Sequence, residues 1–173
     1  MLFQTKSEVR EHVLSHTPQA LPLAGVLQNL SQLLDQQGGA WGAFKAFGEE
    51  PAIEGCLSSS IRWYYPRLKE NDLEFVKPTQ WRRSSLGFQE PTSGEGISIE
   101  ELDGFLVPGV AFSKKGERVG RGRGFYDRAL VQAAGLKVGV CYSYQLFDEL
   151  PTESHDVKMD VVVSDRGIIW LKR

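Results

Sequence analysis

The sequence has little cysteine and no long apolar run, and both shortages exclude classes of protein. Its two cysteines, Cys56 and Cys141, lie in separate apolar runs rather than in a Cys-x-x-Cys pair. We expect two buried thiols in a reducing compartment rather than a disulfide framework. No apolar stretch approaches the ~20 residues that span a bilayer, and the N-terminus lacks the apolar core of a signal peptide. We therefore expect a cytoplasmic protein with no membrane partner.

An excess of positive charge is also missing. The chain carries 20 lysines and arginines against 22 acidic residues, a net charge of -2. A dedicated nucleic-acid binder is usually clearly basic, so no nucleic-acid partner is expected, although a local basic pocket for a small anion is compatible with this balance. The 173 residues are the size of one ordinary domain. With no linker or repeat visible, we expect one domain over residues 1–173 and a monomer.

The first half of the chain predicts two helices and several extended segments. Thr5 and Glu8 have the spacing of a capping box at the start of a helix over 5–15. Apolar residues at helical spacing predict a second helix over 22–37, which Gly38 and Gly39 end. Extended segments are expected at 41–47 and at 59–65, the latter ending at Pro66. Residues 69–100 are polar and turn-rich, with strand-like pieces at 73–76 and 81–83.

The second half alternates strands with a loop and a helix. We expect strands at 104–108, 136–142, 161–163 and 168–170, a glycine-rich loop at 116–124, and a helix over 126–134 that Gly135 ends. This alternation predicts an α/β fold of three layers, α/β/α, with a mostly parallel sheet covered on both faces. In such sheets, ligands bind at the carboxyl ends of the strands.

The glycine-rich loop is the strongest candidate site. Gly120, Gly122 and Gly124 alternate with Arg121 and Arg123. Glycine lets a backbone approach a ligand closely, backbone N–H groups can cradle phosphate oxygens, and arginine suits phosphate or carboxylate. The pattern is neither a P-loop nor a dinucleotide fingerprint, so a flexible solvated loop and an RNA-binding arginine–glycine run stay open as alternatives.

The residues around this loop resemble the 5-formyltetrahydrofolate cyclo-ligases, also called methenyltetrahydrofolate synthetases. Lys6 and Arg10 match that family's N-terminal pair, and Glu50 matches, more loosely, a glutamate that contacts folate. The motifs that carry the resemblance are 107–112, 120–128, the middle motif 87–91, and the C-terminal block at 145–151 and 155–160.

The resemblance implies a fold shared with sugar-phosphate isomerases and CoA transferases. It implies a ligase that forms a C–N bond, with ATP and Mg²⁺ as cofactors. The reaction converts 5-formyltetrahydrofolate to 5,10-methenyltetrahydrofolate, ADP and phosphate through a phosphorylated formyl group.

Site residues follow from the same resemblance, position by position. It implies ATP binding by Lys6, Arg10, Arg118, Gly120, Arg121, Gly122, Arg123, Gly124, Phe125 and Tyr126. Folate binding falls to Glu50, Arg121, Gly122, Arg123, Gly124 and Phe125, and Mg²⁺ binding to Asp127 and Asp156. Arg121 and Arg123 are the implied catalytic residues. Taken alone, Asp127 also fits a favourable place in the first turn of a helix.

Two departures and two rival interpretations accompany this assignment. Leu86 stands where many members carry tryptophan, and Phe125 where tyrosine is common, so one wall of the folate pocket is expected to differ. Lys6 and Arg10 would also fit a solvated helix face. The rivals are a relative without catalysis that binds RNA, and a sugar-phosphate enzyme on the same fold that needs no ATP.

Overall fold

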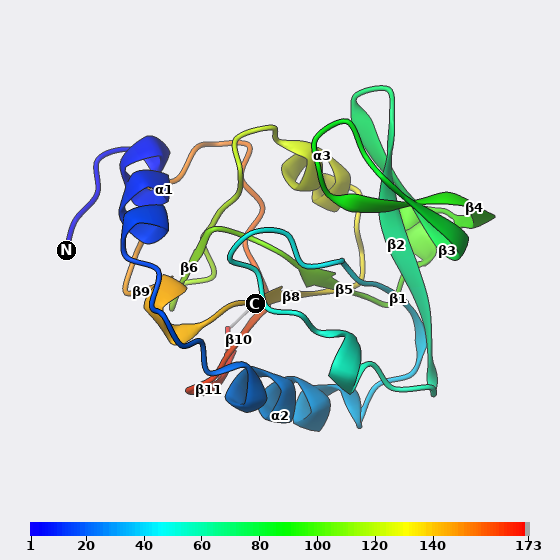
Figure 1. The fold of residues 1–173 in the computed structure, drawn as a ribbon, viewed down its shortest axis with the longest axis horizontal. Helices are drawn as coiled ribbons and strands as arrows, with labels where there is room; N and C mark the ends of the chain where they lie inside the picture. Colours follow the sequence, from blue (N-terminus) through cyan, green and yellow to red (C-terminus); the bar gives the residue numbers. More distant parts are fainter. Residues whose placement is uncertain (172–173) are drawn as a thin grey trace.

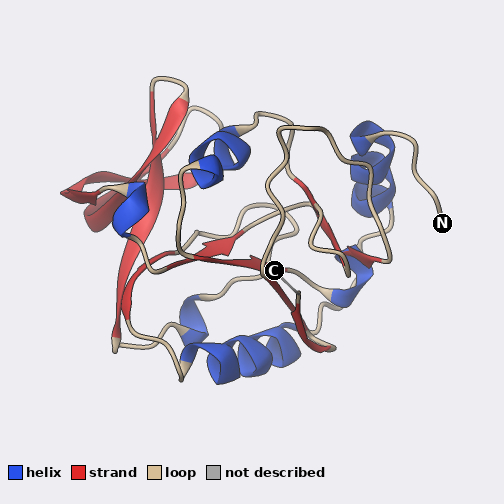
Figure 2. Ribbon diagram, turned by 180° about the vertical axis from the view of Figure 1, so that it is seen from behind, coloured by secondary structure: helices blue, strands red, loops and turns tan. Residues whose placement is uncertain are grey.

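Strands and helices alternate less than the sequence pattern predicts, because the strands within residues 61–97 and within residues 104–119 follow one another with no α-helix between them. The computed structural model describes residues 1–171 (Figures 1 and 2). Its helices are α1 (Lys6–Ser15), α2 (Leu23–Leu34) and α3 (Phe125–Val131), with short 3₁₀ helices at Glu54–Cys56, Ile99–Glu101 and Ser143–Gln145. Its strands are β1 (Gly39–Gly42), β2 (Ile61–Lys69), β3 (Asp72–Arg83), β4 (Gln89–Ile97), β5 (Gly104–Val107), β6 (Ala111–Ser113), β7 (Arg118–Val119), β8 (Leu136–Val140), β9 (Leu146–Phe147), β10 (Val161–Ser164) and β11 (Gly167–Trp170).

One large sheet forms the centre of the molecule. Its strand order is β11-β10-β8-β5-β1-β2-β3-β4. The five inner strands from β10 to β2 pair in parallel, while β3, β4 and β11 join as antiparallel strands at the two edges. The α/β class and the mostly parallel sheet are therefore confirmed. A smaller sheet with the order β7-β6-β9 lies apart from it.

Helices cover both faces of the large sheet, because its central strands are apolar on both sides. In β5, Leu106 belongs to the core cluster that contains the α2 leucines, whereas Phe105 and Val107 belong to the cluster that contains Leu130 of α3. Figure 1 shows α2 on one side of the central strands and α3 on the other. This arrangement is the three-layer α/β/α architecture expected from the sequence.

Helix α1 packs on the small sheet rather than on the large one. Val9 and Val13 are fully buried with Val119 of β7 and with Leu150, which follows β9. The helix begins where the sequence predicts: Thr5 Oγ1 accepts a hydrogen bond from the Glu8 N–H at 3.2 Å. Lys6 and Arg10 lie on the same helix, so this packing brings both to the glycine-rich loop that follows β7.

The expected end of a strand at Pro66 is wrong. Strand β2 runs through Pro66 to Lys69, with Pro66 opposite Phe75 of β3. Two residues on, the Leu68 N–H donates to the Glu90 carboxylate at 2.8 Å rather than to β3. Alternate residues of a strand direct their N–H groups to the same side, so the N–H at position 66 would also point away from β3. Proline, which has no N–H, therefore costs no hydrogen bond between β2 and β3 at this position.

Strands β3 and β4 are the main omission of the sequence analysis. The two strand-like pieces at 73–76 and 81–83 belong to one continuous strand, which bulges between Pro78 and Trp81. The sequence pattern predicts no strand at β4, because its sequence contains two glycines, a proline and a serine, residue types that favour turns over strands. Pairing with β3 makes it a strand in spite of its composition.

Helix α3 is shorter than predicted. It ends at Val131; Gln132 forms a turn, and Ala133 and Ala134 have no regular secondary structure. Gly135 does not cap it; instead, a Cβ there would collide with the backbone of Leu102 and Asp103, so Gly135 permits a close chain crossing. The 116–124 segment is also not all loop, since β7 occupies its middle.

The two cysteines and the membrane prediction can be compared directly with the structure. Both cysteines are free; Cys141 is buried and Cys56 is partly buried. Burial raises the pKa of the Cys56 thiol to about 11. Across residues 1–171, no helix combines the length and apolarity needed to cross a membrane.

Candidate functional site

A cavity opens at the carboxyl ends of β1 and β5, the place expected for a ligand site in a parallel sheet. Its volume is about 430 Å³. Phe44 and Phe47 reach it from the segment after β1, and Pro108 and Gly109 from the segment after β5. The rest of the apolar wall comes from Pro66, Leu73, Leu86, Phe88 and Phe125, and its charged groups from Lys6, Arg10, Lys45, Glu50, Arg118, Arg121, Arg123, Asp127, Glu153 and His155.

A second cavity adjoins the first. Its volume is about 350 Å³, and it extends between the start of α1 and residues 151–153. The two cavities share Lys6, Arg10, Gly122 and Glu153 in their linings. The site is therefore two neighbouring hollows with a cationic boundary, one largely aromatic and apolar, the other largely polar.

The residues singled out from the sequence gather here. Every predicted ATP-binding and folate-binding residue lines the larger cavity, and so does Asp127. The one exception is Asp156, which stands just behind the wall: its Oδ1 atom lies 2.6 Å from Lys6 Nζ, which does line the cavity. The fold therefore brings together predicted site residues that are up to 150 residues apart in the sequence.

The glycines of the loop make room for arginines. A Cβ on Gly120 would lie 2.8 Å from Arg118 Nη1, and one on Gly124 would lie 2.8 Å from Arg128 Nη1. At either position a Cβ would require the guanidinium group to shift. Gly124 also has a φ of +69°, a left-handed conformation that disfavours other residues. The glycine spacing thus lets guanidinium groups lie directly against the loop backbone.

Arg118 is the most deeply placed of these cations. Its side chain is 5% exposed; Nη1 donates to the Pro108 carbonyl at 3.0 Å and Nη2 to Asp127 Oδ1 at 3.3 Å. Within residues 1–171, the buried Arg118 Nε and the Tyr126 hydroxyl have no hydrogen-bond partner. Burial raises the pKa of Tyr126 far above its ordinary value, so this hydroxyl stays protonated beside the cavity.

Glu50 and Arg121 form an ion pair at the opening of the apolar cavity. Arg121 Nε lies 3.4 Å from Glu50 Oε1, and the Phe47 N–H donates to Glu50 Oε2 at 3.0 Å. Burial raises the pKa of Glu50 to about 7, and the nearby Arg121 charge only partly opposes this rise. A carboxyl group that is half ionised at neutral pH therefore faces the cavity, which marks it as a candidate functional group.

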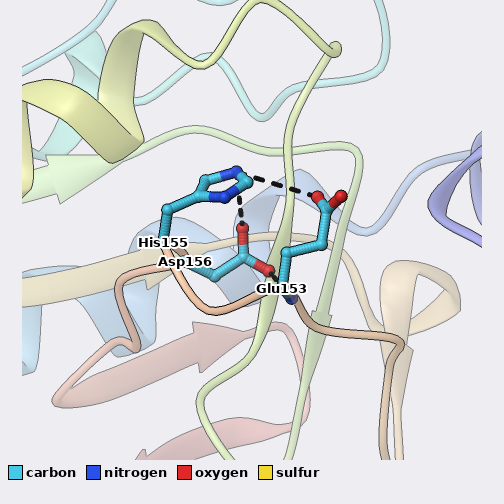
Figure 3. A group of neighbouring side chains, drawn as sticks. All are labelled: Glu153, His155 and Asp156. Carbon is cyan, nitrogen blue, oxygen red and sulfur yellow. Dashed lines mark hydrogen bonds and ion pairs between the residues drawn. The ribbon is translucent and has the colours of Figure 1, made fainter.

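Lys6 sits between two carboxylates at the other end of the site. Its ammonium lies 2.6 Å from Glu153 Oε2 and 2.6 Å from Asp156 Oδ1. Burial works against the charged ammonium, but the two carboxylates outweigh it and raise the pKa of Lys6. His155 completes the group, with Nε2 at 3.7 Å from both carboxylates (Figure 3).

Glu153, His155 and Asp156 have the composition of a cation site. Their ligand atoms lie within 4.8 Å of one another, and the Asp156 side chain is only 8% exposed. Asp127, the other predicted metal ligand, is not in this cluster and pairs with Arg118 instead. Glu153 is not among the residues predicted from the sequence, because it lies between the two parts of the C-terminal block, 145–151 and 155–160.

Comparison with known proteins identifies the family. The family model described as the 5-formyltetrahydrofolate cyclo-ligase family matches residues 47–165. The chain is 33% identical over 147 residues to the 5-formyltetrahydrofolate cyclo-ligase of Mycolicibacterium smegmatis, covering 75% of this chain and 76% of that one. It is 38% identical over 126 residues to the Escherichia coli K12 protein of the same name, covering 66% of this chain and 69% of that one.

Among solved structures, the fold is similar to that of the Aquifex aeolicus 5,10-methenyltetrahydrofolate synthetase. The TM-score is 0.85 at 29% identity, over 97% of this chain and 93% of that one. The segment that the family model matches contains the glycine-rich loop, Glu50 and Asp156. This chain therefore belongs to the 5-formyltetrahydrofolate cyclo-ligase family of ligases.

Proposed function

We propose that this protein catalyses the ATP- and Mg²⁺-dependent cyclisation of 5-formyltetrahydrofolate to 5,10-methenyltetrahydrofolate, with release of ADP and phosphate. The observation that carries the proposal is the pair of adjoining cavities with Lys6 and Arg10 on their shared boundary. A reaction that transfers a phosphoryl group from ATP to a folate has to hold both ligands side by side, and two adjoining cavities with cations between them suit this. The names of the relatives point to a folate substrate, which we assign to the cavity with more aromatic surface.

The larger cavity suits a folate. Phe44, Phe47, Phe88 and Phe125 offer aromatic surface for a pterin ring. Glu50, 8% exposed, would accept hydrogen bonds from the pterin N–H groups. Such donors favour the ionised carboxylate, so folate binding would lower the raised pKa of Glu50.

The nucleotide phosphates would lie against the cationic boundary. Lys6 and Arg10 face both cavities, and the loop from Gly120 to Tyr126 lines the side where the folate formyl group would lie. Arg121 and Arg123 are the loop residues that we assign to the transferred phosphate. Both are exposed residues. Arg123 can turn toward a ligand, whereas Arg121 would first have to leave its partners Glu49 and Glu50.

Mg²⁺ fits the carboxylates of this site. Asp156 and Glu153 supply the oxygen ligands that the ion prefers, and the Lys6 ammonium between them shows that a positive charge is accommodated there. Asp156 and Asp127 are the residues that we propose as its ligands, with Glu153 beside Asp156. When bound, the ion would neutralise phosphate charge.

The chemistry needs no protein nucleophile. The formyl oxygen attacks the γ-phosphorus of ATP, the bond to ADP breaks, and a phosphorylated formyl group remains on N5. N10 then attacks the formyl carbon, loses its proton, and the carbon–oxygen bond breaks to release inorganic phosphate. The chain's own residues hold the two reactants in line and stabilise charge, as in phosphoryl transfer generally.

A substrate screen tests the proposal. Purified protein is mixed with Mg²⁺, ATP and 5-formyltetrahydrofolate, and the near-ultraviolet absorbance of the methenyl product is followed. We expect product only when all three are present, and Arg123→Ala to lower turnover by at least tenfold while the melting temperature stays unchanged. Stabilisation by RNA or by sugar phosphates in a thermal-shift screen, without methenyl product, would refute the assignment and favour a binding module or an isomerase-like enzyme.

A further inference from the structure

Arg121 is held by the segment that follows β1, and this contact is specific. Its Nη2 atom donates to the Phe47 carbonyl at 2.6 Å and to Glu49 Oε2 at 3.3 Å. The guanidinium carbon lies 4.6 Å from the centre of the Phe47 ring. Backbone, carboxylate and aromatic ring therefore all bind one guanidinium group, which links the glycine-rich loop to residues 47–50.

The backbone at Gly48 leaves room for the Arg121 guanidinium group. A Cβ on Gly48 would lie 2.6 Å from Arg121 Nη2, and the residue has a φ of +63°. Any other side chain here would be strained and would also push the guanidinium away. Together with the hydrogen bonds to Phe47 and Glu49 and the contact with the Phe47 ring, this defines a resting position for Arg121 around residues 47–49.

The resting position conflicts with the roles that both partners have in the reaction. Glu50 Oε1, which lies 3.4 Å from Arg121 Nε, is also the atom that would accept from a pterin N–H group. Arg121 is the residue that would reach the transferred phosphate. The two roles, both of which rest on the function proposed above, require the Glu50–Arg121 pair to separate.

We propose that Arg121 exchanges partners during the binding cycle, and that Glu49 is the positioning residue that holds it between cycles. Folate binding takes Glu50 away from Arg121, and the freed edge of the guanidinium turns to the nucleotide phosphate. Binding of the nucleotide first draws Arg121 off Glu50 and leaves that carboxylate open to the pterin. Each ligand therefore tightens the binding of the other, and the coupling is reciprocal.

Calorimetric binding measurements test the exchange without any turnover. The probes are the β,γ-imido analogue of ATP with Mg²⁺, and 5-formyltetrahydrofolate. The Kd of each is measured alone and with the other at saturation. For the wild type we expect each ligand to lower the Kd of the other by at least about fivefold, the lower end of ordinary coupling. In Arg121→Gln the two values should agree within a factor of two.

Two further variants separate the exchange from a general loss of binding. Glu49→Gln weakens the resting position, so the nucleotide analogue alone should bind more tightly than to the wild type, and the KM for ATP should fall with kcat unchanged. A purely structural role for Glu49 would move neither value in that direction. Arg83→Gln removes an exposed arginine of β3 that does not line either cavity, and should keep the wild-type coupling.

The outcomes distinguish this inference from the proposed function. A wild type that forms the methenyl product but shows no coupling, or an Arg121→Gln protein that keeps it, would overturn the exchange and leave the reaction standing. A wild type that binds neither probe would overturn both. Melting temperatures confirm that each variant is folded, and the Glu49→Gln result still decides if Arg121→Gln does not fold.

Discussion

Glu50 offers the sharpest physical test of the site, because its environment makes the stability of the unliganded protein depend on pH. Its pKa rises from an ordinary value of 4.5 to about 7, mainly because the side chain is buried. The folded protein therefore binds this proton more tightly than the unfolded chain does. The stabilising effect of the proton is complete below pH 4.5 and is lost as the pH rises through 7.

The magnitude follows from the same two values. One pKa unit corresponds to about 1.4 kcal/mol, so the rise from 4.5 to about 7 corresponds to about 3 kcal/mol of stability that the wild type loses between these pH values. Glu50→Gln removes the titrating group and keeps a similar shape. We therefore expect the variant to gain stability relative to the wild type with increasing pH, by about 3 kcal/mol between pH 4.5 and pH 8.

Urea unfolding at a series of pH values measures this difference. The free energy of unfolding of Glu50→Gln, minus that of the wild type, is plotted against pH; Glu95→Gln on the exposed face of β4 corrects for the loss of one acidic side chain. A second measurement adds the ligand: folate binding near pH 6.5 should release a proton, detectable by calorimetry in buffers of different ionisation enthalpy. A difference that stays flat from pH 5 to pH 8 would refute the reasoning.

Three other predictions concern the supports of the site. Arg118→Met should lower the free energy of unfolding by about 3 kcal/mol, because it leaves a largely buried carboxylate without its cation; an unchanged urea midpoint would contradict this. Gly104→Ala should cost about 1–3 kcal/mol by overpacking, since its Cβ would lie 2.5 Å from a buried indole, whereas Gly38→Ala, with nothing within 4 Å, should leave the melting temperature nearly unchanged. Lys6→Met should weaken nucleotide binding at least tenfold yet strengthen Mg²⁺ binding measured without nucleotide, because the ammonium no longer competes for the carboxylates; a weaker Mg²⁺ affinity would count against a cation site there.

The layered fold can be predicted from the sequence because the central strands are continuous apolar runs, and such runs indicate burial on both faces. Val161, Val162 and Val163 form an uninterrupted apolar run, and such runs suit a strand covered on both faces. Strand β4 gives no such signal, since its partner on one side is β3 and most of its residues are exposed. β4 is extended because it pairs with β3, and this pairing cannot be predicted from the local sequence of β4.

The candidate site, too, can be predicted from the sequence only in part. Glycine and arginine alternating before a helix indicated a phosphate-binding loop, and the structure places the loop at the larger cavity. No local pattern indicates which partner each arginine has. The pairing of Arg121 with Glu49 depends on a contact across 72 residues, and the grouping of Lys6 with Glu153 across 147. Such pairings come from the packing of α1 and of the β1 segment, not from spacing along the chain.

The close fit of glycines to guanidinium groups has a consequence for how this loop can change over time. Gly120 and Arg118, Gly124 and Arg128, and Gly48 and Arg121 are in each case two halves of one contact. A larger residue at the glycine has to displace the tip of the arginine, whereas the arginine can change while the glycine stays. At Gly120, which has no left-handed φ, loss of Arg118 removes the obstacle to a larger residue; at Gly48 and Gly124 the left-handed φ still disfavours other residues. We therefore expect the Gly120–Arg118 pair to change at the arginine first, and Gly48 and Gly124 to outlast their partners in descendants of this sequence.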